Sequence, residues 1–289
     1  YFENTGSPFV PSFGPAQKNP FGLSGIDFFT SPELVDIDAD GDLDLFSGNY
    51  WGRLHFFENT GTASSPAFDS LAGNGAINPF GITAPNSNFA YNYYFIPAFA
   101  DLDADGDFDL AVAAVSYYGN MFYYENTGTP AMPAFGNAQF YPFGIDSEIG
   151  RGQPTFVDID KDNDMDLFVG DFHGEIHFHE NTGSPTMPAF ATPVTSPEGL
   201  MVAGRKAAPA FADIDNDGDW EAFIGMGHGG IYFFENSGLW NHAPDIASPA
   251  LTITIFPNPA EDVVNVALKP RAFPKPARFA VEVFDILGQ

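Results

Sequence analysis

The chain of 289 residues contains no cysteine, which excludes disulfides, thiolate metal sites and a cysteine nucleophile. Basic residues are also scarce, because 10 Lys and Arg stand against 38 Asp and Glu and the formal net charge is −28. This charge disfavours nucleic acid and anionic membrane surfaces as partners. No run of 18 apolar residues occurs, so the sequence predicts no membrane span.

Glycine, proline and aromatic residues are abundant instead. The 30 Gly and 25 Pro favour many turns between short strands. The 32 Phe belong to a hydrophobic fraction of 44%, which is enough for a sizeable core. The length suits one large β domain followed by a piece of another.

More than half of the acidic residues lie in a nine-residue segment that occurs four times. Each copy has an acid at positions 1, 3, 5, 7 and 9 and Gly or Asn at position 6. The 20 acids are Asp36, Asp38, Asp40, Asp42 and Asp44; Asp101, Asp103, Asp105, Asp107 and Asp109; Asp158, Asp160, Asp162, Asp164 and Asp166; and Asp213, Asp215, Asp217, Asp219 and Glu221.

Carboxylates packed so closely require a cation or protons, since two like charges about 4 Å apart repel by roughly 4 kcal/mol at an effective dielectric near 20. Ca²⁺ suits these segments better than Mg²⁺, which demands a strict octahedron. We predict one Ca²⁺ per segment, held by the side chains at positions 1, 3, 5 and 9. Position 7 would contribute its backbone carbonyl (Asp42, Asp107, Asp164 and Asp219). Position 6 would supply the positive φ of a sharp turn (Gly41, Gly106, Asn163 and Gly218).

An EF-hand begins in the same way, but its position 12 is a bidentate Glu. Here position 12 is Ser47, Val112, Val169 or Ile224. The residues after each acidic segment are short apolar runs typical of buried strands. The sequence therefore predicts a calcium loop between two strands.

Each acidic segment belongs to a longer repeat. A Pro stands four residues before the first Asp, and an apolar strand follows the loop. A Gly-containing turn and an aromatic strand come next, and then a Glu-Asn-Thr-Gly turn, which is Glu-Asn-Ser-Gly in the fourth unit. A Pro-Ala-Phe segment follows in the first three units. A looser stretch leads to the next unit. Intervals of 65, 57 and 55 residues predict an all-β propeller of four-stranded blades. A calcium β-helix would need a Gly-Gly-x-Gly-x-Asp repeat, which the sequence lacks.

The order of acidic loop, apolar strand and Asn-Thr-Gly turn resembles the VCBS and FG-GAP-like repeats of calcium-binding proteins such as integrin α subunits. The resemblance covers residues 1–238, with Asn163 in place of Gly and Glu221 in place of Asp. It implies a propeller with one calcium per loop on one face, and it implies no single function. The chain begins within a unit, so we expect four full blades, part of a fifth, and a parent protein that continues upstream.

The character of the chain changes after a linker at residues 239–250. Alternating residues in 251–289 predict the strands of a partial small β-sandwich that packs apart from the propeller. The segments 256–260 (Phe-Pro-Asn-Pro-Ala) and 281–288 resemble the C-terminal sorting domain of the type IX secretion system. That resemblance implies the secretion machinery as a partner. It also implies a secreted or outer-surface location in a Gram-negative bacterium.

Three other features have competing interpretations. The Glu of the repeated turn (Glu58, Glu125, Glu180 and Glu235) recurs in every unit, which favours a structural role over catalysis. His173, His177 and His179 could form a metal cluster, but His177 and His179 align with aromatic residues of other units. The Asn- and Tyr-rich stretch 86–95 could bind sugar or protein, although an ordinary aromatic strand is favoured.

The sequence shows no nucleophile–base signature, no phosphate loop and no unique carboxylate pair. We therefore predict a non-enzymatic, secreted or cell-surface, calcium-binding propeller for adhesion, ligand binding or scaffolding. Its ligand would be an extracellular protein or carbohydrate. The alternative is a non-catalytic propeller module of an extracellular, polysaccharide-degrading enzyme whose catalytic domain lies outside this chain.

Overall fold

Strands account for nearly all of the regular structure in a computed structural model of the chain. It describes residues 1–6, 12–23, 29–69, 76–83, 94–115, 120–140, 142–145, 152–200, 202, 204–214, 217–236, 253–256 and 265–268. In these residues the helical elements are two short 3-10 turns, η3 (Pro142–Gly144) and η4 (Pro197–Gly199). No helix in this part of the chain is long and apolar enough to cross a membrane.

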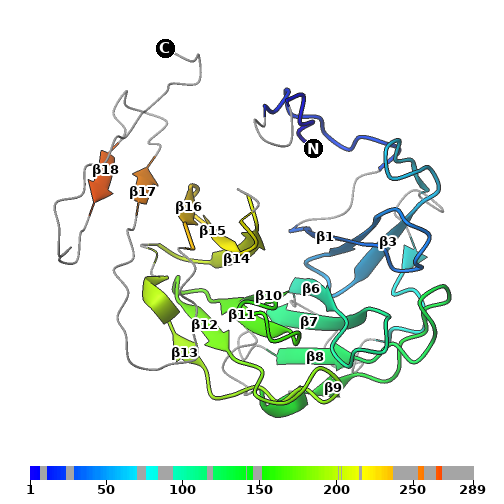
Figure 1. Cartoon of the computed structure of the whole chain (residues 1–289). Helices are drawn as coiled ribbons and strands as arrows, with labels where there is room; N and C mark the ends of the chain where they lie inside the picture. Colours follow the sequence, from blue (N-terminus) through cyan, green and yellow to red (C-terminus); the bar gives the residue numbers. More distant parts are fainter. Residues whose placement is uncertain are drawn as a thin grey trace.

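Four antiparallel sheets follow one another in an arc, as the blades of a propeller (Figure 1). The first blade contains β1 (Ser31–Val35), β2 (Asp44–Gly48), β3 (Leu54–Asn59) and β4 (Phe68–Asp69), with β5 (Ala76–Ile77) also paired to β3. The second contains β6 (Tyr94–Ala100), β7 (Asp109–Val115), β8 (Asn120–Tyr124) and β9 (Gln139–Phe140). The third contains β10 (Gln153–Val157), β11 (Asp166–Gly170), β12 (Ile176–His179) and β13 (Val194–Thr195). The fourth begins with β14 (Ala207–Ala212), β15 (Glu221–Met226) and β16 (Ile231–Phe234). The all-β propeller predicted from the repeat is confirmed.

The residues before the first blade form a turn like the one that closes the later blades. Near the N-terminus, Asn4 Oδ1 accepts hydrogen bonds from Gly6 N and Ser12 N, as the Asn of the closing turn does in later blades. The described residues 1–6 and 12–23 thus contain the closing turn of a preceding unit.

At the other end, β17 (Ile253–Phe256) and β18 (Asn265–Leu268) extend the sheet of the fourth blade, and β17 pairs with β16 at Phe233 and Ile253. The expectation that this segment packs apart from the propeller is therefore wrong for these two strands. The physical reason is that an edge strand such as β16 offers free backbone groups for pairing. The predicted boundaries of the linker, at 239 and 250, lie outside the described residues and stay predictions.

Each core cluster joins two neighbouring blades. The middle strands β2 and β11 are buried along their whole length, because both faces of a blade are covered. Phe46 of the first blade shares a cluster with Phe122 of the second, and Met121 of the second shares one with Leu167 of the third. Phe168 packs in turn with side chains of the fourth blade. Stacking of the sheets, and not any single sheet, buries the hydrophobic residues.

A second link between blades comes from a Pro-Phe-Gly turn within the stretch that the sequence analysis left as a loose connection. The Phe of this turn has a φ of 55–56° and is Phe21, Phe80 or Phe143. Its carbonyl accepts a hydrogen bond of 2.8–2.9 Å from the Phe of the next unit's Pro-Ala-Phe segment, which is Phe68, Phe135 or Phe190. These turns therefore connect consecutive units through the backbone.

The close approach of neighbouring blades predicts a strong effect of a single added methyl group. A Cβ on Gly170 would lie 2.4 Å from the carbonyl oxygen of Ala207 in the next blade, whereas a Cβ on the equivalent Gly225 would meet nothing closer than 3.8 Å. We expect Gly170→Ala to lower the free energy of unfolding by about 1–3 kcal/mol, as overpacking does. Gly225→Ala should change it by less than about 0.5 kcal/mol. Urea unfolding in saturating calcium measures both values, and equal effects would contradict the described packing between blades.

Candidate metal centres

The four acidic segments occupy equivalent places in the four blades. Each lies between the first and second strands of its blade, as the β1–β2, β6–β7, β10–β11 and β14–β15 connections. Because each ends at the first residue of the second strand, all four lie at the same end of their blades. The prediction of a loop between two strands is confirmed. In the fourth loop, Asp215 and Asn216 lie outside the described residues.

The carboxylate at position 1 wraps the loop around itself. Asp36 Oδ1 accepts a hydrogen bond from Asp40 N, and Asp36 Oδ2 accepts one from Gly41 N, both at 3.1 Å. Asp158 makes the same two contacts with Asp162 N and Asn163 N. These bonds tie the backbone at positions 5 and 6 to the carboxylate at position 1.

The backbone at position 6 has the conformation that the sequence predicts. Its φ is 95° at Gly41 and Gly106, 90° at Gly218 and 72° at Asn163. Position 4 also has a positive φ, at Ala39, Ala104 and Lys161, with values of 55–65°. The sequence analysis did not anticipate this, because Ala and Lys carry no local signal for a left-handed conformation.

The acid at position 9 links the loop to the turn that closes the blade. In the first three loops this Asp is only 1–2% exposed. Its Oδ1 accepts a hydrogen bond of 2.7–2.8 Å from the backbone N–H of the Asn in the Glu-Asn-Thr-Gly turn, in the pairs Asp44–Asn59, Asp109–Asn126 and Asp166–Asn181. The side chain of that Asn binds two further backbone N–H groups, as Asn59 does with Gly61 and Ala67. The turn thus holds the carboxylate at position 9 in place.

Carboxylate oxygens converge in every loop. The acids at positions 1, 3 and 5 of the first three loops have ligand atoms within 4.8 Å of one another, and so do Asp217, Asp219 and Glu221 in the fourth. In the described residues, nine buried carboxylate oxygens of these loops have no hydrogen-bond partner. They belong to Asp38, Asp42, Asp44, Asp101, Asp107, Asp164, Asp166, Asp213 and Asp219. A buried anionic oxygen without a partner is costly unless a cation or a proton meets it.

The position-7 side chains, for which the sequence predicted no ligand role, are buried. Asp42, Asp107, Asp164 and Asp219 are 5–8% exposed, and each has one unpartnered oxygen. The backbone carbonyl at this position stays the predicted ligand, and the carboxylate beside it is a further candidate.

Burial raises the pKa of the loop carboxyls. The pKa of Asp44, Asp109 and Asp166 rises to about 7, with desolvation as the largest cause and neighbouring loop carboxylates as a smaller one. The pKa of Asp107, Asp164 and Asp219 rises to about 6, again mainly through desolvation. The ion-free loop therefore resists full ionisation. A hard divalent cation with flexible oxygen coordination removes that cost, and the all-oxygen donor set fits calcium.

The histidine cluster considered from the sequence does not assemble. His179 is fully buried and its Nδ1 contacts the carbonyl of Ala191 at 3.1 Å, whereas His173 is exposed. Of these three histidines, His177 alone joins a group of metal-ligating side chains within the described residues, and its companions are Asp171 and Glu175. Of the repeated Glu residues, Glu58 and Glu235 are exposed. Most of the Asn- and Tyr-rich stretch 86–95 lies outside the described residues.

Comparison with known families assigns the repeat. A family model described as FG-GAP-like repeat matches residues 36–112, 101–169 and 158–224. The chain belongs to the FG-GAP-like repeat family. Each match begins at the first Asp of one acidic loop and ends in the strand after the next, so the FG-GAP-like unit spans two neighbouring loops. A second model, described as the secretion system C-terminal sorting domain, matches residues 254–289.

Similarity to individual proteins is weak. Among solved structures, a mutant form of the Photorhabdus luminescens Tc holotoxin pore matches with 15% identity and a TM-score of 0.37. The match covers 81% of this chain and 12% of the holotoxin chain, and at this level it carries no argument about function. Comparison with curated proteins found no match.

Proposed function

We propose that this FG-GAP-like propeller is a secreted or cell-surface calcium-binding module that serves in adhesion, ligand binding or scaffolding and carries out no catalysis itself. The observation that carries the proposal is the convergence of unpartnered, buried carboxylate oxygens in the same loop of each blade. Four such loops at one end of the blades would hold four Ca²⁺ ions.

Calcium would have a structural role in this chain. In the first loop, Asp36, Asp38, Asp40 and Asp44 would bind through their side chains and Asp42 through its backbone carbonyl. Four carboxylates around one Ca²⁺ leave a net charge of −2, so the ion removes most of the repulsion within the loop. Because Asp44 also accepts from Asn59, the ion would fix the closing turn together with the loop.

The sorting-domain match indicates a protein that type IX secretion delivers outside the cell or to its surface. Calcium is millimolar outside cells, and loops with several carboxylates can be tuned to that range. The chain has no cysteine. Bound ions would therefore contribute the stability that disulfides provide in many secreted proteins.

Exposed aromatic rings support a ligand-binding role. Phe29, Tyr50, Trp51 and Tyr94 form a chain of ring contacts with centroids 5.0–5.9 Å apart. Phe29 is 60% exposed and Trp51 is 44% exposed. Tyr50 and Trp51 lie in the β2–β3 turn, at the opposite end of the blade from the calcium loop. Such rings are suited to stacking on the sugars or apolar side chains of an extracellular ligand.

Calorimetric titration of the chelated protein with Ca²⁺ tests the proposal. We expect four sites in the unaltered protein and three in Asp103→Ala, because that change removes one ligand oxygen pair from the second loop only. Asp69→Ala, which alters an exposed acid on β4 outside the loops, should keep all four sites. A protein in which Asp103→Ala leaves the number of sites unchanged would refute the loop as the site of binding.

A further inference from the structure

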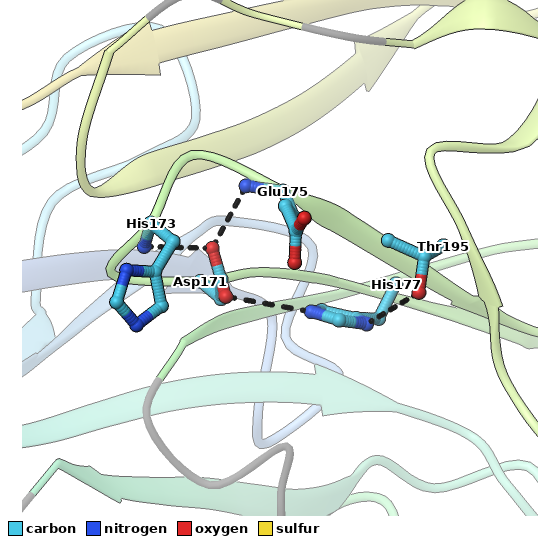
Figure 2. A network of polar contacts seen from close by, with 5 residues as sticks. All are labelled: Asp171, His173, Glu175, His177 and Thr195. Carbon is cyan, nitrogen blue, oxygen red and sulfur yellow. Dashed lines mark hydrogen bonds and ion pairs between the residues drawn. The ribbon is translucent and has the colours of Figure 1, made fainter.

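A separate cluster of metal-ligating side chains lies in the third blade, at the end of β11 opposite to its acidic loop. The turn Asp171–Glu175 joins β11 to β12, and Asp171 N donates to Glu175 O at 2.9 Å. Asp171 Oδ1 accepts hydrogen bonds of 2.8 Å from the backbone N–H groups of His173 and Glu175. These bonds hold the Asp171 carboxylate so that its other oxygen faces His177, as Figure 2 shows.

Three side chains meet at this point. Asp171, Glu175 and His177 each place a ligand atom within 4.8 Å of the others. His177 Nε2 and Asp171 Oδ2 are 3.6 Å apart. That is long for a charge-assisted hydrogen bond, which measures about 2.7–2.9 Å. It is close to the separation of about 3.4 Å expected for two ligands, each about 2.1 Å from one tetrahedral ion.

The other ring nitrogen of His177 faces a hydroxyl group that can orient the imidazole for metal binding. His177 Nδ1 lies 3.4 Å from Thr195 Oγ1 on β13 (Figure 2). In the tautomer in which Nδ1–H donates to the Thr195 hydroxyl, Nε2 keeps its lone pair toward Asp171 and Glu175. Metal-binding histidines are commonly oriented by such a hydrogen bond on the other ring nitrogen.

The first blade contains the same turn with different chemistry. There Asn49 Oδ1 accepts from the backbone N–H groups of Trp51 and Arg53, and Asn49 Nδ2 lies 3.0 Å from His55 Nε2. An amide donor thus meets the imidazole directly, in a pair that is 0–2% exposed. In the third blade a carboxylate replaces the amide, and Glu175 occupies the place of Arg53.

The two substitutions change what the turn can bind. Two anionic side chains now surround an imidazole nitrogen, and the Asp171 and His177 side chains are 17% and 20% exposed, so ions in solution can reach them. Imidazole favours divalent transition metals, whereas calcium prefers oxygen ligands only. The site is therefore chemically distinct from the four acidic loops.

We propose that Asp171 Oδ2, the Glu175 carboxylate and His177 Nε2 bind one divalent transition-metal ion, with Zn²⁺ as the best match, and that water completes its coordination. The ion ties the β11–β12 turn to the start of β12. Through the bond from His177 to Thr195, it also braces the outer strand of the third blade.

The test uses the full chain with its acidic loops saturated by millimolar calcium, titrated with Zn²⁺ by calorimetry. We expect one zinc ion per chain in the unaltered protein. Asp171→Asn should weaken zinc binding by at least about tenfold. This variant reproduces the Asn49 turn of the first blade, so it should fold and, without zinc, melt at the same temperature as the unaltered protein. His177→Gln should lose zinc to a similar degree, and His173→Gln should keep it.

A Co²⁺ titration supplies an independent readout, since ligation by His177 should give a visible absorption band that Asp171→Asn lacks. Zinc uptake that is equal in the unaltered protein and in Asp171→Asn would place the ion in the acidic loops and overturn the proposal. Loss of binding in His173→Gln equal to that in His177→Gln would overturn the assigned ligand set.

Discussion

Chelation of calcium should lower the melting temperature of this protein by about 20 °C or more. A ligand present at 100 times its dissociation constant stabilises the folded state by about 2.7 kcal/mol per site, so four sites contribute on the order of 10 kcal/mol. That is comparable to the whole stability of a typical domain. One kcal/mol shifts the melting temperature by about 2–4 °C in a domain of 150–250 residues. Circular dichroism melts with EDTA and with calcium measure the difference.

Two controls test whether the effect is specific for calcium and whether it depends on the acidic loops. Calcium added after chelation should restore the original melting temperature, and magnesium at the same concentration should restore less, since it dehydrates reluctantly. Asp38→Ala affects one loop of four. It should reduce the difference between the melting temperatures in calcium and in EDTA without abolishing it. A melting temperature indifferent to EDTA would remove the structural role of calcium.

The calcium-free protein should become less stable as the pH rises from about 5 to 8. Asp44, Asp109 and Asp166 have folded-state pKa values of about 7. The unfolded value is near 3.9. Between these values the folded state binds more protons than the unfolded state. The contribution of these carboxyls to the free energy of unfolding is therefore complete below about pH 4 and is lost as the pH rises through 7. We expect the urea midpoint in EDTA to fall over this range.

In saturating calcium the stability should instead increase as the pH rises, because protons compete with the ion for the same oxygens at low pH. Asp44→Asn provides a matched variant, since its amide oxygen can still accept from Asn59 N but carries no charge. It should be more stable than the unaltered protein at pH 8 in EDTA, and it should lose one calcium site. A calcium-free protein whose stability increases between pH 5 and 8 would show that burial does not raise the pKa of these carboxyls.

Much of this architecture could be predicted from the sequence because the repeat is local. The spacing of Asp36 to Asp44 and the apolar run after it define a loop between strands, and each of the four copies forms the same connection. Gly41 and Asn163 adopt the positive φ predicted for position 6, since few other residues tolerate it.

Contacts between distant positions were not predictable in the same way. The bond from Asn59 N to Asp44 depends on how β3 returns beside β2, and the spacing within each motif does not encode it. The Pro-Phe-Gly turn was overlooked because its partner, as in Phe21 and Phe68, lies in the next unit. A cluster of the three histidines was disfavoured because His177 and His179 align with aromatic residues of other units, and His179 indeed occupies a core position, fully buried with its Nδ1 3.1 Å from the carbonyl of Ala191.

Anomalous X-ray scattering from crystals grown in calcium is the most direct test of the central claim, which is that the acidic loops hold calcium. The account predicts one strong peak within each of the four loops, at about 2.3–2.6 Å from carboxylate oxygens at positions 1, 3, 5 and 9. The position-7 carbonyl should lie at the same distance. Loops without peaks in calcium-saturated crystals, with their carboxylates turned to solvent, would contradict it.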